Sequence, residues 1–134
     1  MKLEFGCNNH VESFTRDEAL NDEYSPLTED ALNIPAGEYT FVYTYPLSRE
    51  AKFKHTLDPS INLIQLLLRA KGDYEMIYAL EENAAGNPGH IPGMLNRQAS
   101  DGPYGIWGHD LSDLYFESVE VDTKKMIVSF GIGS

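Results

Sequence analysis

The chain has 134 residues, of which 42% are hydrophobic and 23% charged, and a formal net charge of −11. This length suffices for one hydrophobic core, and the composition is that of a globular domain. An acidic chain repels phosphate backbones, so we expect no direct nucleic-acid binding and favour a protein partner with a basic surface.

Cysteine content and hydropathy indicate a cytoplasmic protein. Cys7 is the single cysteine, which excludes an intrachain disulfide and favours a reducing compartment. Residues 1–10 lack a basic segment followed by an apolar run, so we expect no secretory signal. The longest nearly apolar run, Ile61 to Leu68, is too short to cross a bilayer, and we expect no membrane association.

The first third of the chain predicts short helices separated by loops. Thr15 and Glu18 have the spacing of a capping box, in which the threonine hydroxyl caps the helix and the glutamate reaches back. Ser25 followed by Pro26 suits the start of a second short helix.

The next segment predicts a β-hairpin. Aromatic residues alternate with smaller or polar ones from Tyr39 to Tyr45, and a second alternating run covers Phe53, His55 and Leu57. The aromatic face is expected to lie in the core, although four aromatic side chains could instead stack on a planar ligand.

A helix is predicted between Asp58-Pro59, which suits a helix start, and Gly72, which suits a left-handed stop. Apolar residues cover most of its circumference, so we expect it to be buried across the sheet. A homodimer interface along this helix is the alternative. Residues 73–82 are ambiguous: the alternation of tyrosine and aliphatic residues predicts a buried strand, whereas the segment from Ala79 favours a helix. We predict the strand.

Two more strands are predicted, from Tyr115 to Val121 and from Met126 to Ile132, joined by a four-residue turn. Residues 110–113 can form one short helical turn before them. The predicted fold is therefore α+β in a single domain over residues 1–134. It has one mostly antiparallel sheet of about five strands, one buried apolar helix and a short-helical N-terminal region.

The run from Ile34 through Pro35, Ala36 and Gly37 to Tyr39, followed by an aromatic strand, resembles the opening of the small-molecule-binding domains related to the gyrase inhibitor family. Those domains are also small, acidic and α+β. The resemblance is confined to this short segment, and the rest of the chain does not follow the pattern of the family.

The long connection over residues 83–110 carries six glycines and three prolines. Connections of this length are usually functional or disordered. Apolar residues recur along it, which predicts an ordered segment packed on the sheet. They are Ile91, Met94, Leu95, Ile106 and Trp107.

Candidate binding residues in this connection are Trp107, Tyr104 and Arg97. Trp107 could be a recognition hot spot, but we favour an aromatic plug that holds the connection on the sheet. Arg97 is the only basic residue between Lys71 and Lys124, and we expect it to pair with a carboxylate such as Asp101. Anion binding is the alternative.

Candidate catalytic residues are His90, His109 and Asp110, with Glu81 or Glu82 near them in the sequence. The chain contains no zinc-binding, nucleophile-elbow or phosphate-loop motif, so we expect no metal and no cofactor.

These observations favour a small acidic binding or regulatory protein that acts through protein contacts. The connection over residues 83–110 is the leading contact region, and the acidic N-terminal third comes second. A specialised form would be an inhibitor whose carboxylates mimic nucleic acid. The alternative from another class is a small hydrolase or metal-dependent enzyme that uses His90, His109 and Asp110.

Overall fold

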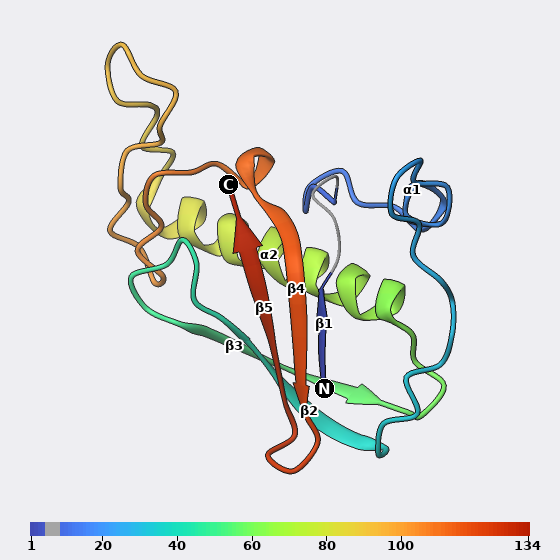
Figure 1. Ribbon diagram of the computed structural model, residues 1–134. Helices are drawn as coiled ribbons and strands as arrows, with labels where there is room; N and C mark the ends of the chain where they lie inside the picture. Colours follow the sequence, from blue (N-terminus) through green and yellow to red (C-terminus); the bar gives the residue numbers. More distant parts are fainter. Residues whose placement is uncertain (5–8) are drawn as a thin grey trace.

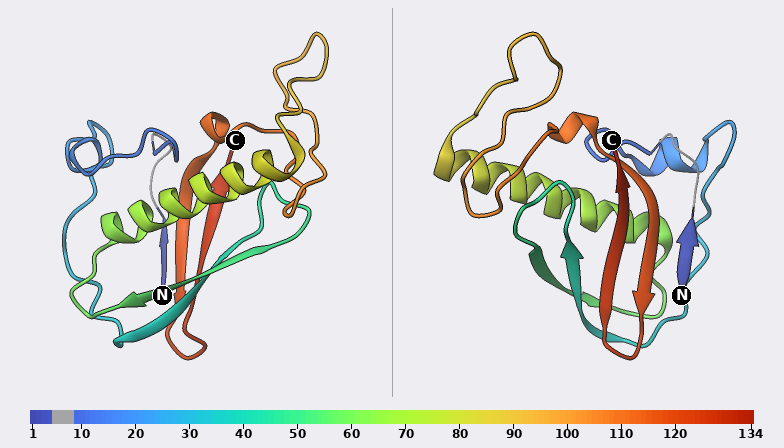
Figure 2. Two further views of the ribbon diagram at one scale, coloured as in Figure 1. Left: turned by 180° about the vertical axis from the view of Figure 1, so that it is seen from behind. Right: turned by 60° about the vertical axis from the view of Figure 1, so that its left-hand side comes forward.

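A computed structural model describes residues 1–4 and 9–134 and shows an α+β fold (Figure 1). Cys7 lies outside the described residues. One sheet contains five strands in the order β1-β4-β5-β2-β3, and the long helix α2 crosses one of its faces (Figure 2). The elements in chain order are β1 (Lys2–Glu4), α1 (Arg16–Leu20), β2 (Gly37–Tyr43), β3 (Ala51–Leu57), α2 (Leu63–Ala85), the 3-10 turn η1 (Leu111–Asp113), β4 (Tyr115–Asp122) and β5 (Ile127–Gly133).

The two predicted hairpins are confirmed, because β2 pairs antiparallel with β3 and β4 pairs antiparallel with β5. The junction between the hairpins is parallel: β2 and β5 pair from Thr40↔Ile127 to Val42↔Ser129. The sheet is therefore mixed rather than mostly antiparallel. Alternation of side chains along a segment identifies a strand, but it does not show how two strands far apart in the sequence are oriented. The orientation of β5 relative to β2 depends on the path of the chain between the two hairpins, through α2 and the long connection.

The predicted strand over residues 73–82 is wrong, since α2 continues through Gly72 to Ala85. Its buried residues Tyr74, Ile77, Tyr78 and Glu81 recur every three or four positions, as one face of a helix does. A Cβ added at Gly72 would meet no other atom, so this glycine lies on the open side of the helix. A glycine within a helix costs about 1 kcal/mol relative to alanine, which packing of the buried face can offset.

The start of α2 also differs from the prediction. Asn62 caps it: the Asn62 side chain accepts from the Gln65 N–H (2.8 Å), and the Gln65 side chain accepts from the Asn62 N–H (3.0 Å). Asp58 accepts from the Ser60 N–H in the preceding turn (2.9 Å). The residue that caps the helix therefore lies four positions after Asp58.

The N-terminal prediction is half right. Thr15 caps α1 through a hydrogen bond from the Glu18 N–H to its hydroxyl (3.2 Å). No helix follows Ser25-Pro26 in the described chain; the Ser25 N–H instead donates to the Asp22 carboxylate in a turn (3.2 Å). A single-residue cap with no apolar face behind it is too weak to specify a helix.

The core lies between α2 and the sheet. Tyr39, Phe41 and Tyr43 of β2 are buried, as expected of the core face of a strand. The hydroxyls of the two tyrosines are hydrogen-bonded: that of Tyr39 donates to the Pro35 carbonyl, and that of Tyr43 donates to the carboxylate of the buried Asp73. The Asp73 carboxylate also lies 2.7 Å from His55 Nε2. None of the helices formed by the described residues combines the length and the apolar character needed to span a membrane.

Candidate functional site

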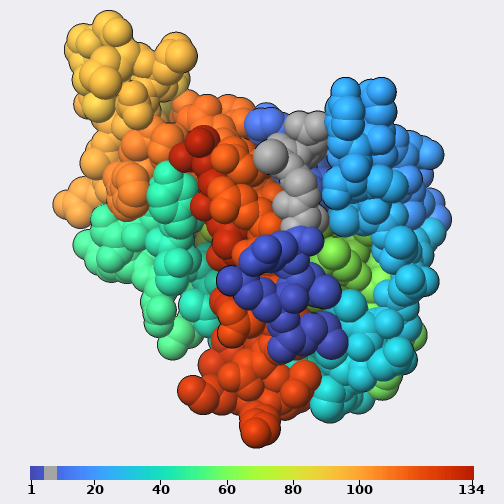
Figure 3. All heavy atoms as spheres, viewed as in Figure 1, coloured from blue at the N-terminus to red at the C-terminus, as the bar shows by residue number. Residues whose placement is uncertain are grey.

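The connection between α2 and η1 contains no helix or strand, and two segments of it behave differently. We call residues 89–98 the finger and residues 100–106 the clamp loop. The finger projects from one end of the molecule, beyond the end of α2 (Figures 1 and 3). The clamp loop turns back onto the last turns of α2.

The finger is a short hairpin-like excursion. Its two sides are joined by the Gln98 N–H to the Gly89 carbonyl and by the Ile91 N–H to the Asn96 carbonyl, each at 2.9 Å. At its tip, the Met94 N–H donates to the Ile91 carbonyl (2.9 Å), and Gly93 takes a positive φ of 74° that other residues rarely adopt. The tip therefore has a defined backbone path.

Apolar side chains at the tip are exposed. The exposed fraction is 93% for Leu95, 55% for Met94 and 39% for Ile91. The prediction that these residues pack on the sheet is therefore wrong, because the finger extends past the body and leaves their side chains largely in solvent (Figure 1).

Trp107 is also not the predicted plug. Its side chain is 41% exposed and meets the Tyr45 ring edge-on, with the centroids 5.3 Å apart. The neighbouring Ile106 is fully buried and takes the core position instead. Alternation of side-chain direction along an extended segment allows only one of two neighbours to face the core.

Arg97 secures the base of the finger. Arg97 is only 2% exposed, and its guanidinium lies 5.2 Å from the centre of the Tyr78 ring. The backbone N–H of Arg97 donates to the Gly108 carbonyl (3.0 Å). Nη1 lies 3.7 Å from Glu82 and 3.6 Å from Asp110. The predicted pair with Asp101 is wrong, because Asp101 lies at the surface near Arg49 instead.

The histidine candidates do not form one site. His90 Nε2 lies 2.6 Å from an Asp110 carboxylate oxygen. His109 uses other neighbours: its Nδ1 is 3.7 Å from Asp113, and its Nε2 is 3.1 Å from the Ser134 hydroxyl. Among the described residues, no group of three or more His, Cys, Asp or Glu side chains is placed to hold a metal ion.

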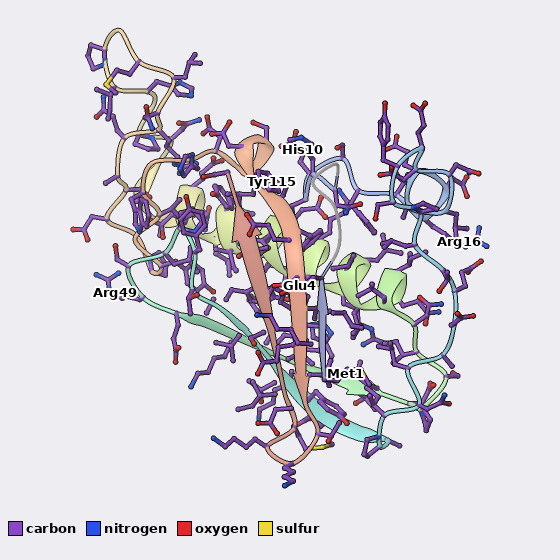
Figure 4. The ribbon with its side chains drawn as sticks, viewed as in Figure 1. Met1, Glu4, His10, Arg16, Arg49 and Tyr115 are labelled. Atoms are coloured by element: carbon purple, nitrogen blue, oxygen red, sulfur yellow. The ribbon has the colours of Figure 1, made fainter. Side chains whose placement is uncertain are left out.

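Two hollows flank η1. One, of about 360 Å³, is lined by His109, Asp113 and Ser134 together with His10, Tyr115 and Leu95. Figure 4 shows His10 beside Tyr115, where β4 begins. The other, of about 420 Å³, we call the acidic cleft; it is lined by Arg97, Tyr78 and the carboxylates of Glu12, Glu75, Glu82 and Asp110. Asp110 and His109 therefore line different hollows.

The clamp loop is organised by Glu81, which is fully buried at the end of α2. Its carboxylate accepts the Ser100 hydroxyl and four backbone N–H groups: those of Tyr104 (2.8 Å), Gly102 (3.1 Å), Ile106 (3.2 Å) and Gly105 (3.3 Å). The loop approaches so closely that a Cβ added at Gly102 would lie 2.5 Å from a Glu81 oxygen.

The hydrogen bonds decide the ionisation of Glu81. Burial raises the pKa of its carboxyl, but the hydrogen bonds from Ser100, Tyr104, Ile106 and Gly102 together lower it by more. The pKa therefore lies below the ordinary value of 4.5, and Glu81 is buried as a charged acceptor. Sequence reasoning noted Glu81 only as a neighbour of the histidines; the signal it missed was a glutamate on the buried face of α2.

Comparison with known proteins gives no match to any family model, curated protein or solved structure.

Proposed function

We propose that this protein is a cytoplasmic binding or regulatory protein that acts through protein contacts, with the finger as its main contact segment. The observation that carries the proposal is the exposed apolar tip formed by Ile91, Met94 and Leu95. Apolar side chains gathered on a projection lose contact with water when a partner covers them, which favours association. Methionine also adapts its shape to different partner surfaces.

The base of the finger supports this role because it limits the freedom lost on binding. Arg97 is buried under the finger, and His90 is held by Asp110. A contact segment that is already ordered pays less entropy when it binds. Trp107 is 41% exposed and directly precedes Gly108, whose carbonyl accepts the backbone N–H of Arg97, so it would lie at the edge of the contact. Tyr104, the other candidate binding residue, lies in the clamp loop.

The net charge of −11 specifies the partner further. The apolar tip fits a partner pocket of apolar character, and the net negative charge of the chain fits a partner whose surface is basic. A second copy of this chain carries the same net negative charge and would be repelled, so a different protein is the better fit. Self-association is an outcome that the test below distinguishes.

The test uses two double variants with matched side chains. Met94→Ser/Leu95→Ser changes the tip, and Met76→Ser/Leu80→Ser changes exposed residues of the same types on α2. Affinity capture from source-cell extract should recover a protein with the wild type and the α2 variant but not with the tip variant. Binding of the purified partner should weaken as salt is added. Equal capture by both variants contradicts the proposal, and a concentration-dependent dimer in light scattering would make the second copy the occupant.

A second candidate function is a small hydrolase, and a specific arrangement favours it. The Ser134 hydroxyl lies 3.1 Å from His109 Nε2, and Asp113 lies at ion-pair distance, 3.7 Å, from His109 Nδ1, so a hydroxyl, an imidazole and a carboxylate follow one another in one hollow. Of the sequence candidates His90, His109 and Asp110, only His109 belongs to this arrangement, since His90 pairs with Asp110. If the site is catalytic, His109→Ala should lower p-nitrophenyl acetate hydrolysis by about 100-fold or more, whereas His90→Ala should not. Equal rates for the two variants would eliminate this function.

A further inference from the structure

The acidic cleft lies beside the base of the finger and has a wall of charged side chains. Glu75, Tyr78 and Glu82 of α2 lie three and four residues apart, so they share one face of the helix. Asp110 and Glu12 complete the carboxylates that line it. At about 420 Å³, the cleft is large enough for an extended side chain and a short stretch of backbone.

The cleft has an excess of negative charge. Four carboxylates face a single lining cation, Arg97. Lys71 approaches Glu75 at 3.9 Å and donates to the Glu12 carbonyl, and His90 approaches Asp110 at 2.6 Å. Among the described residues, Glu82 has only Arg97 within ion-pair distance. Such a cleft attracts cations and repels anions. Acidic surfaces are often simply solvated, so the charge alone does not indicate a ligand.

Arg97 supplies the second, independent indication. Its side chain is 1% exposed, and its Nε and Nη2 atoms are buried without a hydrogen-bond partner in the described part of the chain. Its Nη1 contacts to the two carboxylates, at 3.6 and 3.7 Å, are longer than direct hydrogen bonds. Buried guanidinium N–H groups without acceptors are costly, and the cost is relieved when an oxygen acceptor binds.

One kind of ligand meets both requirements. It carries a positive group that faces Glu12, Glu75 and Glu82. It also carries a neutral oxygen that accepts from Arg97, because the carboxylates of the cleft would repel a negatively charged oxygen. A metal ion does not fit, since no group of three ligating side chains in the described residues is placed to hold one. A peptide segment does fit: it offers a lysine or arginine side chain and a backbone carbonyl within a few ångströms of each other.

We propose that the acidic cleft binds a lysine or arginine side chain of the partner protein, while a backbone carbonyl of the same segment accepts hydrogen bonds from Arg97. This inference rests on the proposed contact function and specifies the partner's chemistry next to the finger. Arg97 Nε and Nη2 are buried in the free protein. A side chain at the cleft wall must therefore move slightly before the partner's carbonyl can accept from them. The Arg97 Nε–H group should therefore report binding directly.

The test is an NMR titration of the intact chain with N-acetyl-lysine N-methylamide. The expected result is saturable shifts at the Arg97 Nε–H signal and at backbone amides of residues 75–82 and 110–111. N-acetyl-norleucine N-methylamide has the same backbone and no ammonium group, and it should bind at least about tenfold more weakly. Glu82→Gln should weaken binding of the lysine probe by about tenfold, whereas Glu117→Gln, which changes an exposed carboxylate on β4, should not.

Three outcomes overturn the inference: no saturable shift, equal binding of the two probes, or equal loss in the two glutamine variants. The finger is tested separately, because Met94→Ser/Leu95→Ser leaves the cleft intact and should bind the lysine probe like the wild type. Probe binding without any tip-dependent partner would refute the contact function alone. A tip-dependent partner without probe binding would refute the cleft inference alone.

Discussion

The finger and the clamp loop belong to one connection and have similar glycine and proline content, yet they relate to the body in opposite ways. The clamp loop directs four backbone N–H groups and a hydroxyl to the buried Glu81 carboxylate and places Ile106 in the core. In the finger, the backbone N–H groups of Ile91, Met94 and Gln98 donate to carbonyls of the finger itself, and the apolar tip is exposed. Composition therefore does not decide whether a loop is held by the fold. The availability of a buried acceptor does.

The largest expected difference in stability is between alanine substitutions of two isoleucines, one in the clamp loop and one in the finger. Ile106→Ala should lower the free energy of unfolding by about 2–5 kcal/mol, because it removes a fully buried side chain. Ile91→Ala, at the finger tip, should change it by less than about 1 kcal/mol. Urea unfolding of both variants measures this difference, and equal midpoints would mean that the two segments do not differ in packing.

The next largest effect on the free energy of unfolding is expected from Glu81, the acceptor that holds the clamp loop. Glu81→Gln keeps the shape of the side chain but replaces a carboxylate that accepts five donors with an amide, so we expect a loss of about 1–3 kcal/mol. Glu75→Gln, on an exposed position of the same helix, should stay within about 0.5 kcal/mol of the wild type. A stable Glu81→Gln variant with the wild-type midpoint would show that the clamp loop is held by apolar packing alone.

A pH titration sharpens the same contrast. Because the pKa of Glu81 is lower in the folded chain than its ordinary value of 4.5, its charge stabilises the fold above that value. This contribution is lost as the pH falls from about 4.5 through the folded pKa. Glu81→Gln should therefore lose less stability than the wild type between pH 6 and the acid range, measured by urea unfolding at each pH. Parallel curves would contradict a charged Glu81 in the clamp.

Hydrogen exchange should show the smallest and most local difference. The amides of Tyr104 and Ile106, which donate to Glu81, should be protected. In the finger, Leu95 should exchange quickly, while Ile91 and Met94 should show modest protection from their bonds within the hairpin. Uniform exchange across residues 91–107 would erase the distinction between the two segments.

The sequence predicted the four strands of the two hairpins well, because alternation of large and small or polar side chains is a local property. It did not predict the three-residue strand β1, Lys2–Glu4. It missed the second half of α2 because Tyr74, Met76, Tyr78 and Leu80 also alternate. Only their burial shows which period holds: Tyr74 and Tyr78 are buried, whereas Met76 and Leu80 are exposed. Gly72 reinforced the error, since a glycine on the open side of a helix does not end it.

The candidate site was harder to predict than the fold. The pair of His90 and Asp110 combined two residues that the sequence had selected, but His109 turned to Asp113 and Ser134. Glu81 could have been recognised from its place on the buried face of α2, once the helix was extended past Gly72. The burial of Arg97 depends on contacts between the long connection and α2, which no local pattern records. Charged residues are rarely fully buried, so sequence reasoning places them at the surface by default.

The finger also marks a place where the chain can be divided. A break between Gly93 and Met94 separates a fragment that carries β1, β2, β3 and α2 from one that carries β4 and β5. Every strand pairing of the sheet survives, and the fragments would meet through the parallel β2 and β5 ladder, the β1 and β4 ladder and the Glu81 clamp. Exposed loop tips tolerate such breaks because no core contact depends on them. The two fragments should therefore reassemble when mixed. Because each fragment would carry part of the finger tip, a partner that binds the finger would also affect how readily the fragments reassemble.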